Sequence, residues 1–137
     1  MNQYQFSDMR LGLNAKFDVQ LTLEMLDGFM SLSGDSNPLH QNDAYALEKG
    51  FPGRVAFGML TSALYSRLVG VHLPGKHCLL QGIEVAFQKP AFVGDVLTVD
   101  GAVSYINESY QVIELKAEIR NQLGHRISKA KIKVGFI

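Results

Sequence analysis

Strict alternation of apolar and polar residues in the C-terminal half of the chain most constrains its fold. In QVIELKAEI, apolar side chains fall at every second position from 113 to 119, and the same period recurs in GIEVAFQ, VLTVDGAVSY and SKAKIKVGF. Side chains two positions apart lie on one face of a strand, so this period predicts antiparallel strands with one buried face. In the last of these segments, Lys129, Lys131 and Lys133 would occupy the solvent face.

The N-terminal half has mostly helical spacing, after a short strand expected at 16–21. Thr22 can cap a helix over 23–32 that ends at Gly34, and Asp43 can cap a short helix over 44–49. The segment 59–73 is the longest helix expected, because apolar residues recur there at intervals of three and four: Met59, Leu60, Ala63, Leu64, Leu68 and Val71. Its other face is only mildly polar, so we expect it to be largely buried. One long helix covered by an antiparallel sheet is an α+β arrangement.

The zero net charge and the single cysteine narrow the classes of function. The chain has 137 residues, enough for one domain with a sizeable core, and we expect a single domain over 1–137. Thirteen basic residues balance thirteen acidic ones, so no broad attraction to nucleic acid or to an anionic membrane is expected. Cys78 alone cannot form an intramolecular disulfide, and no apolar run is long enough to span a bilayer. These features predict a soluble, cytoplasmic protein.

The decapeptide GDSNPLHQND is a candidate catalytic segment, because it places Asp35, Asn37 and His40 around Pro38. On a continuous helix, Asp35 and His40 would point roughly 140° apart. The proline pushes Asn37 out of helical geometry, so the chain can fold back and bring the two side chains together. A carboxylate and an imidazole facing one cavity can hold and activate a water molecule. The alternative is an ordinary polar turn with a surface histidine, and the decapeptide alone favours that turn.

Gly58 opens the long expected helix and is a second candidate for chemistry. A helix N-terminus carries free N–H groups and partial positive charge, and glycine lets a ligand oxygen approach the backbone. This combination suits an oxyanion site for a carbonyl, but taken alone the glycine is more often simply the end of a loop. Ser66, two turns further along, is either a pocket residue or a serine bonded to its own helix.

Three stretches together resemble the MaoC-like hydratases, which include the (R)-specific enoyl-CoA hydratases. They are SGDSNPLHQNDAYA, FPGRVAFGMLTSALYS and QKPAFVGDVLTV, and the resemblance extends from about Phe29 to Val99. It implies a hot-dog fold, in which a curved antiparallel sheet wraps a long central helix. It also implies a homodimer with two sheets joined edge to edge, which would cover an exposed apolar strand.

The resemblance also implies roles for individual residues. Asp35 and His40 would be the catalytic dyad, and the Gly58 N–H would bind the thioester oxygen. Ser66 would line the pocket near the acyl group, and Asn37 would have an orienting role. The family commonly has a histidine before the oxyanion glycine, where this chain has Phe57. The backbone amide of Gly58 is retained despite that change, but the change can alter the choice of substrate and the reaction rate.

The implied reaction interconverts trans-2-enoyl and (3R)-3-hydroxyacyl thioesters, so the protein would be a hydro-lyase of fatty acid metabolism. The partner would be a substrate carried on CoA or on acyl carrier protein, and no metal or redox cofactor is required. Two alternatives stay open. Hot-dog folds also support thioester hydrolysis, and the Phe57 departure is compatible with a subunit that binds acyl thioesters without catalysis.

Other candidates are weaker. His72, His77 and Cys78 lie close in sequence but match no common zinc spacing. The three alternating lysines, Lys89 and Arg54 are candidates for phosphate contact, although such residues more often form a solvated face. Tyr65, Phe87 and Phe92 are expected in the core.

Overall fold

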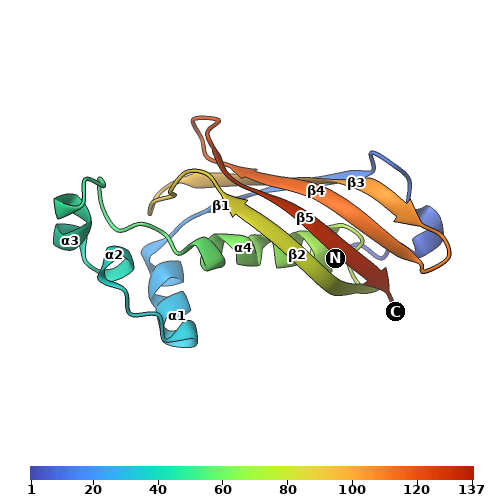
Figure 1. The fold of residues 1–137 in the computed structure, drawn as a ribbon, viewed down its shortest axis with the longest axis horizontal. Helices are drawn as coiled ribbons and strands as arrows, with labels where there is room; N and C mark the ends of the chain where they lie inside the picture. Colours follow the sequence, from blue (N-terminus) through green and yellow to red (C-terminus); the bar gives the residue numbers. More distant parts are fainter.

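A computed structural model describes residues 1–137, and its centre is one five-stranded antiparallel sheet. The strands lie in the order β1-β3-β4-β5-β2. Their bounds are β1 (Asn14–Gln20), β2 (Cys78–Phe87), β3 (Val96–Asn107), β4 (Val112–Arg120) and β5 (Arg126–Phe136). The helical elements are η1 (Phe6–Asp8), α1 (Leu23–Ser33), α2 (Pro38–Gln41), α3 (Asp43–Glu48), α4 (Gly58–Arg67) and η2 (Leu68–His72). Figure 1 shows α4 lying along one face of the curved sheet, as the sequence predicted.

The predicted alternation sets the register of the strands. Leu115 pairs with Ile132 and Ala117 with Ala130, and these residues face the helix. The three alternating lysines of β5 lie on the opposite, exposed face, as expected. β2 departs from the pattern, because 41% of Ile83 and 52% of Phe87 remain exposed although they share the inner face. β2 is an edge strand with a neighbouring strand on one side only, so the alternation predicts which face its side chains share but not how deeply they are buried.

The predicted helix over 59–73 forms as α4 followed by the π-helical turn η2. Its mildly polar face is buried at Thr61, Ser62 and Tyr65, as expected, whereas Met59, expected inside, is 65% exposed. Hydrogen bonds allow the hydroxyl groups to be buried. Thr61 Oγ1 and Ser62 Oγ each donate to the Gly58 carbonyl oxygen, at 2.8 and 3.0 Å. A buried hydroxyl that keeps a hydrogen bond is not penalised as an unpaired one would be.

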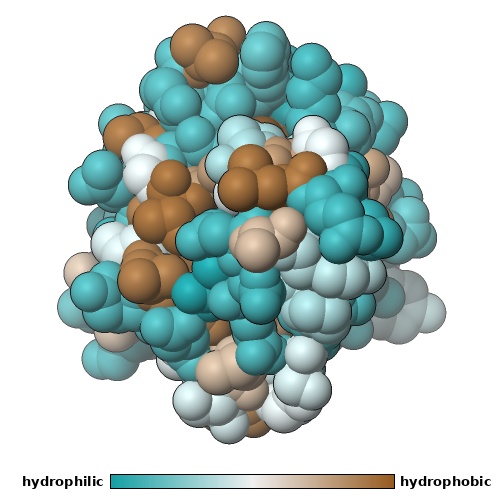
Figure 2. All heavy atoms as spheres, turned by 90° about the vertical axis from the view of Figure 1, so that its left-hand side faces the viewer, coloured by the Kyte–Doolittle hydropathy of each residue, from teal (hydrophilic) through white to brown (hydrophobic).

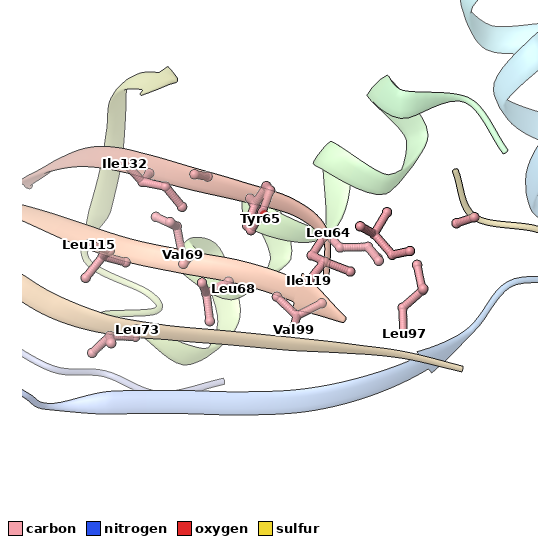
Figure 3. Packing of buried hydrophobic residues seen from close by; sticks show 14 of the residues in the cluster. Leu64, Tyr65, Leu68, Val69, Leu73, Leu97, Val99, Leu115, Ile119 and Ile132 are labelled. Carbon is pink, nitrogen blue, oxygen red and sulfur yellow. The ribbon is translucent and has the colours of Figure 1, made fainter. Parts of the chain in front are cut away.

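The hydrophobic core lies between this helix and the inner face of the sheet. It forms one cluster of 21 buried residues. Figure 3 shows side chains of α4 and η2, among them Leu64, Leu68 and Val69, interleaved with those of the strands, such as Leu115 and Ile132. The cluster holds the helix against the sheet, and with it the N-terminus of α4.

The first three helices gather beyond one end of α4 (Figure 1). Thr22 accepts the Met25 N–H at 3.3 Å and Gly34 ends α1 with φ of 74°, so both predicted boundaries are confirmed. The cap predicted at Asp43 is wrong, because Asn42 Oδ1 accepts the Tyr45 N–H and starts α3. Figure 2 views this end of the molecule, where hydrophobic residues form separate small groups among hydrophilic ones.

No helix combines the length and the apolar character needed to cross a membrane.

Candidate active site

His40 lies in the four-residue helix α2, and its ring has a defined orientation. Nδ1 is 2.7 Å from the Val55 carbonyl oxygen. A carbonyl oxygen can only accept a hydrogen bond, so Nδ1 of the neutral ring carries the proton. Nε2 is then the unprotonated nitrogen, and the hydrogen bond of the His40 ring is made by Nδ1. His40 is therefore set up as a proton acceptor at Nε2.

Phe57 forms the surface on which the His40 ring rests. The two rings are stacked, with centroids 4.1 Å apart and planes inclined by 29°. Phe57 is only 2% exposed and also contacts Phe29, with ring centroids 4.9 Å apart. The residue at which this chain departs from the family pattern is thus a core side chain that supports His40.

His40 and Gly58 line the same cavity of about 500 Å³. Its other walls are mainly apolar and include Ala56, Met59 and Phe87, and Lys89 also lines it. A mostly apolar pocket with a few polar groups is the usual form of a small-molecule site. The structure therefore brings two of the predicted site residues together.

The Gly58 N–H is a free donor at the start of α4. No acceptor in the chain receives it, as expected for the first residue of a helix. The Phe87 ring packs over the glycine, and a Cβ built there would lie 3.0–3.3 Å from three ring atoms. Glycine lets the ring approach the backbone this closely, and a larger side chain would require the ring to shift by a few tenths of an ångström.

Asp35 does not line this cavity, and no hydrogen bond joins it to His40. Its carboxylate is exposed and Oδ1 accepts the Asn37 N–H at 3.1 Å. Asn37 Oδ1 in turn accepts the Leu39 N–H at 3.0 Å and caps α2. The polar turn that the sequence also suggested is thus present, and it projects Asp35 to the surface.

Ser66 is exposed on α4 and lies away from the cavity. It is not bonded back to its own helix either, unlike Thr61 and Ser62. Neither interpretation of Ser66 from the sequence is realised within the single chain.

The weaker candidates fall into three groups. No three His, Cys, Asp or Glu side chains are grouped so that they could hold a metal ion. Lys129 and Lys131 line a second hollow of about 820 Å³ on the outer face of the sheet, where glutamates and an aspartate also occur, so its charge is mixed. Arg54 is only 12% exposed and pairs with Asp27, so it is not free for phosphate contact.

Two groups that shape the site were not foreseen from the sequence. The Val55 carbonyl orients His40, and a backbone acceptor leaves no residue-type signal. The Arg54 side chain donates to the His40 carbonyl oxygen at 2.6 Å. The two residues are far apart in the sequence, so their spacing could not predict this contact.

The curved sheet that wraps a central helix is the arrangement of the hot-dog proteins. A cavity that contains a histidine and the free N-terminus of that helix is the kind of site found in hot-dog enzymes. The family model described as "MaoC like domain" matches residues 10–122, and the chain belongs to this family. It is 33% identical over 116 residues to an (R)-specific enoyl-CoA hydratase of Aeromonas caviae, covering 85% of this chain and 87% of that protein.

Solved structures agree. The (R)-hydratase of A. caviae involved in PHA biosynthesis superposes with a TM-score of 0.90 at 30% identity, covering 94% of this chain and 98% of that one. The unliganded R-hydratase PhaJ1 of Pseudomonas aeruginosa also gives a TM-score of 0.90, at 27% identity and with coverage of 96% and 84%. The predicted hot-dog fold is confirmed.

Proposed function

We propose that the protein catalyses the reversible addition of water to trans-2-enoyl thioesters, giving (3R)-3-hydroxyacyl thioesters. The observation that carries this proposal is the pairing of His40 Nδ1 with the Val55 carbonyl, which leaves Nε2 as a base in the cavity that Gly58 also lines. Membership of the MaoC-like family supports the same reaction. The acyl group would be carried on CoA or on acyl carrier protein.

The free Gly58 N–H would receive the thioester oxygen. Hydrogen bonding there, together with the partial positive charge of the α4 N-terminus, withdraws electrons from the C2=C3 double bond and makes C3 electrophilic. The interaction strengthens as negative charge develops on that oxygen in the enolate-like state. A donor of this kind is typically worth about a hundredfold in rate.

His40 Nε2 would take one proton from water while the hydroxide oxygen forms its bond to C3. His40 Nε2 then delivers that proton to C2, where the electron pair of the enolate forms the C2–H bond, so both parts of one water molecule are added. We assign the Asp35 carboxylate the role of holding the same water, which requires the Pro38 turn to move so that Asp35 reaches the mouth of the cavity that His40 lines. Asn37 supports that role, because its N–H already binds the Asp35 carboxylate. In dehydration the steps reverse.

We also propose a homodimer and a cytoplasmic location. The exposed apolar residues of the edge strand β2, among them Leu79, Leu80 and Ile83 at 52%, 43% and 41%, support an edge-to-edge partner. A second copy would also cover exposed parts of α4, which include Ser66. The single unpaired thiol, Cys78, agrees with a reducing compartment.

Hydration of crotonyl-CoA tests the proposed reaction. The loss of the conjugated enoyl thioester absorbance should be accompanied by a (3R)-hydroxyacyl product on chiral analysis. Release of free CoA thiol without hydration would instead establish thioester hydrolysis. Saturable binding of short and medium enoyl-CoAs and of the corresponding enoyl carrier proteins, without any turnover, would contradict the proposal.

A further inference from the structure

We propose that Arg54 is a positioning residue that fixes the orientation and the tautomer of His40. The claim about His40 geometry stands on contacts within the chain, whereas its effect on rate rests on the proposed function. Arg54 does not line the cavity that contains His40 and Gly58, so its action passes through His40.

The guanidinium of Arg54 joins the catalytic segment to α1. Its Nε donates to the His40 carbonyl oxygen at 2.6 Å, and its Nη2 donates to Asp27 Oδ1 at 2.7 Å. The Arg54 side chain is 12% exposed and the Asp27 side chain is 52% exposed. The guanidinium is therefore largely shielded from solvent, whereas the carboxylate is partly solvated. Charge-assisted hydrogen bonds in such a place are stronger and more directional than neutral ones.

Main-chain groups of Arg54 and Val55 also fix the position of the His40 segment. The Val55 N–H donates to the Leu39 carbonyl at 3.1 Å, and the Val55 carbonyl accepts His40 Nδ1–H at 2.7 Å. The Arg54 N–H is itself held by Asp43 Oδ1 at 2.9 Å. Two consecutive residues therefore hold both the main chain and the ring of one histidine fourteen or more positions earlier.

His40 needs this external support because α2 has only four residues. A helix of one turn is not stable by itself, and its preceding residues form an exposed turn. Without Arg54, the His40 carbonyl loses its charged donor and the segment can shift relative to Val55. The bond to Nδ1 would then weaken, and the proton could move to Nε2, the nitrogen that must accept a proton.

Lysine cannot replace arginine at this position. Arg54 uses two different nitrogens of one planar group to reach two acceptors on different elements. A lysine ammonium is a compact charge on a flexible stem and does not provide this fixed fork. The Arg54→Lys variant should therefore keep the charge and lose part of the positioning.

The test compares Arg54→Met with a matched control, Arg120→Met. Arg120 also donates to one carboxylate, Glu118, and to one backbone carbonyl, that of Gly124, but it does not line the cavity and does not contact His40. Long-range ¹H–¹⁵N spectra of the imidazole rings report the tautomer of each of the four histidines. The His40 signals are assigned by their loss in His40→Gln.

In the wild type we expect the neutral His40 ring to be the Nδ1–H tautomer. In Arg54→Met its ring nitrogens should shift toward averaged values while the other three histidines stay unchanged. The kcat/KM for crotonyl-CoA should fall by about tenfold to a hundredfold, the range expected when a catalytic group is misplaced. Arg54→Lys should be intermediate, and Arg120→Met should change neither readout.

An unchanged His40 tautomer in Arg54→Met would overturn the proposal, whatever the activity. If Arg54→Met does not fold, Asp27→Ala gives the same readout, because it removes the anchor of the guanidinium and leaves Arg54 in place. A normal His40 spectrum in that variant would then overturn the proposal. The spectra separate this claim from the hydratase assignment, since an enzyme inactive on enoyl-CoA would still show the His40 change.

Discussion

A buried hydrogen bond between Tyr65 and Ser128 offers a sharp test of how the central helix is attached to the sheet. Tyr65 Oη and Ser128 Oγ are 2.8 Å apart, and both residues are 0% exposed. The bond joins α4 to β5 in the middle of the core. Because no water reaches either group, removing one partner leaves the other without a replacement.

We expect Tyr65→Phe and Ser128→Ala each to lower the free energy of unfolding by about 1–3 kcal/mol, the cost of leaving a buried polar group unpaired. For a chain of this length, each kcal/mol corresponds to roughly 3–5 °C in Tm. The double variant leaves no orphaned hydroxyl. Its loss should therefore be smaller than the sum of the two single losses by about 1 kcal/mol or more.

Urea unfolding followed by circular dichroism measures all four corners of this cycle. Tyr105→Phe is the matched control, because that tyrosine is 48% exposed and its hydroxyl receives only an exposed bond from Asn107. It should change stability by less than about 0.5 kcal/mol. Strictly additive losses from Tyr65→Phe and Ser128→Ala would refute the reasoning, because they would show that the two hydroxyls do not depend on each other.

The remaining predictions concern pH, the oxyanion glycine and a helix cap. Burial, followed by the charges of Arg67 and the N-terminus, lowers the pKa of His72 from 6.5, so the unfolded chain binds the proton first. The free energy of unfolding should fall as pH drops below about 6.5, and His72→Phe should flatten this dependence in urea titrations at several pH values. Gly58→Ala keeps the N–H donor but places a Cβ 3.0 Å from the Phe87 ring, so kcat/KM should fall by tenfold or more while Tm changes little. An unchanged rate would show that access to this N–H does not need glycine. Asn42→Ala removes the cap of α3 and should cost about 1 kcal/mol by thermal unfolding, whereas no loss would show that the cap is dispensable.

The strands and the boundaries of α1 could be predicted because local sequence rules decide them. Alternation fixed which residues of β4 and β5 face the helix, and Thr22 and Gly34 have side-chain or backbone properties suited to helix ends. The helix α2 was not expected, since four residues after a proline give no periodic signal. The cap of α3 was misplaced by one residue, because Asn42 and Asp43 are both good caps and only the fold decides between them.

The start of α4 shows where periodicity fails. Met59 was expected inside and is exposed, whereas the mildly polar face is buried at Thr61 and Ser62, as expected. A hydropathy pattern does not show that both hydroxyls donate to the Gly58 carbonyl oxygen. These hydrogen bonds offset the free-energy cost of burying the hydroxyls. The edge position of β2, which leaves Phe87 half exposed, likewise depends on strand order rather than on strand sequence.

The candidate site was predicted in part. The sequence motif indicated His40 and Gly58, and the fold places both at one cavity. Spacing could not show that the Pro38 turn carries Asp35 to the surface. The support of His40 by Val55 and Arg54 depends on contacts between segments more than a dozen residues apart, which a single sequence does not reveal.

A double-mutant cycle of turnover on Asp35 and His40 tests the central claim most directly. Wild type, Asp35→Asn, His40→Gln and the double variant are compared for kcat/KM in crotonyl-CoA hydration, with circular dichroism to confirm folding. If the two side chains act on one water, each single change costs at least about a hundredfold. The double change then costs little more than the larger single change, because groups that act as a unit are not additive. Near-normal turnover in either single variant, or independent and multiplicative losses, would contradict the account.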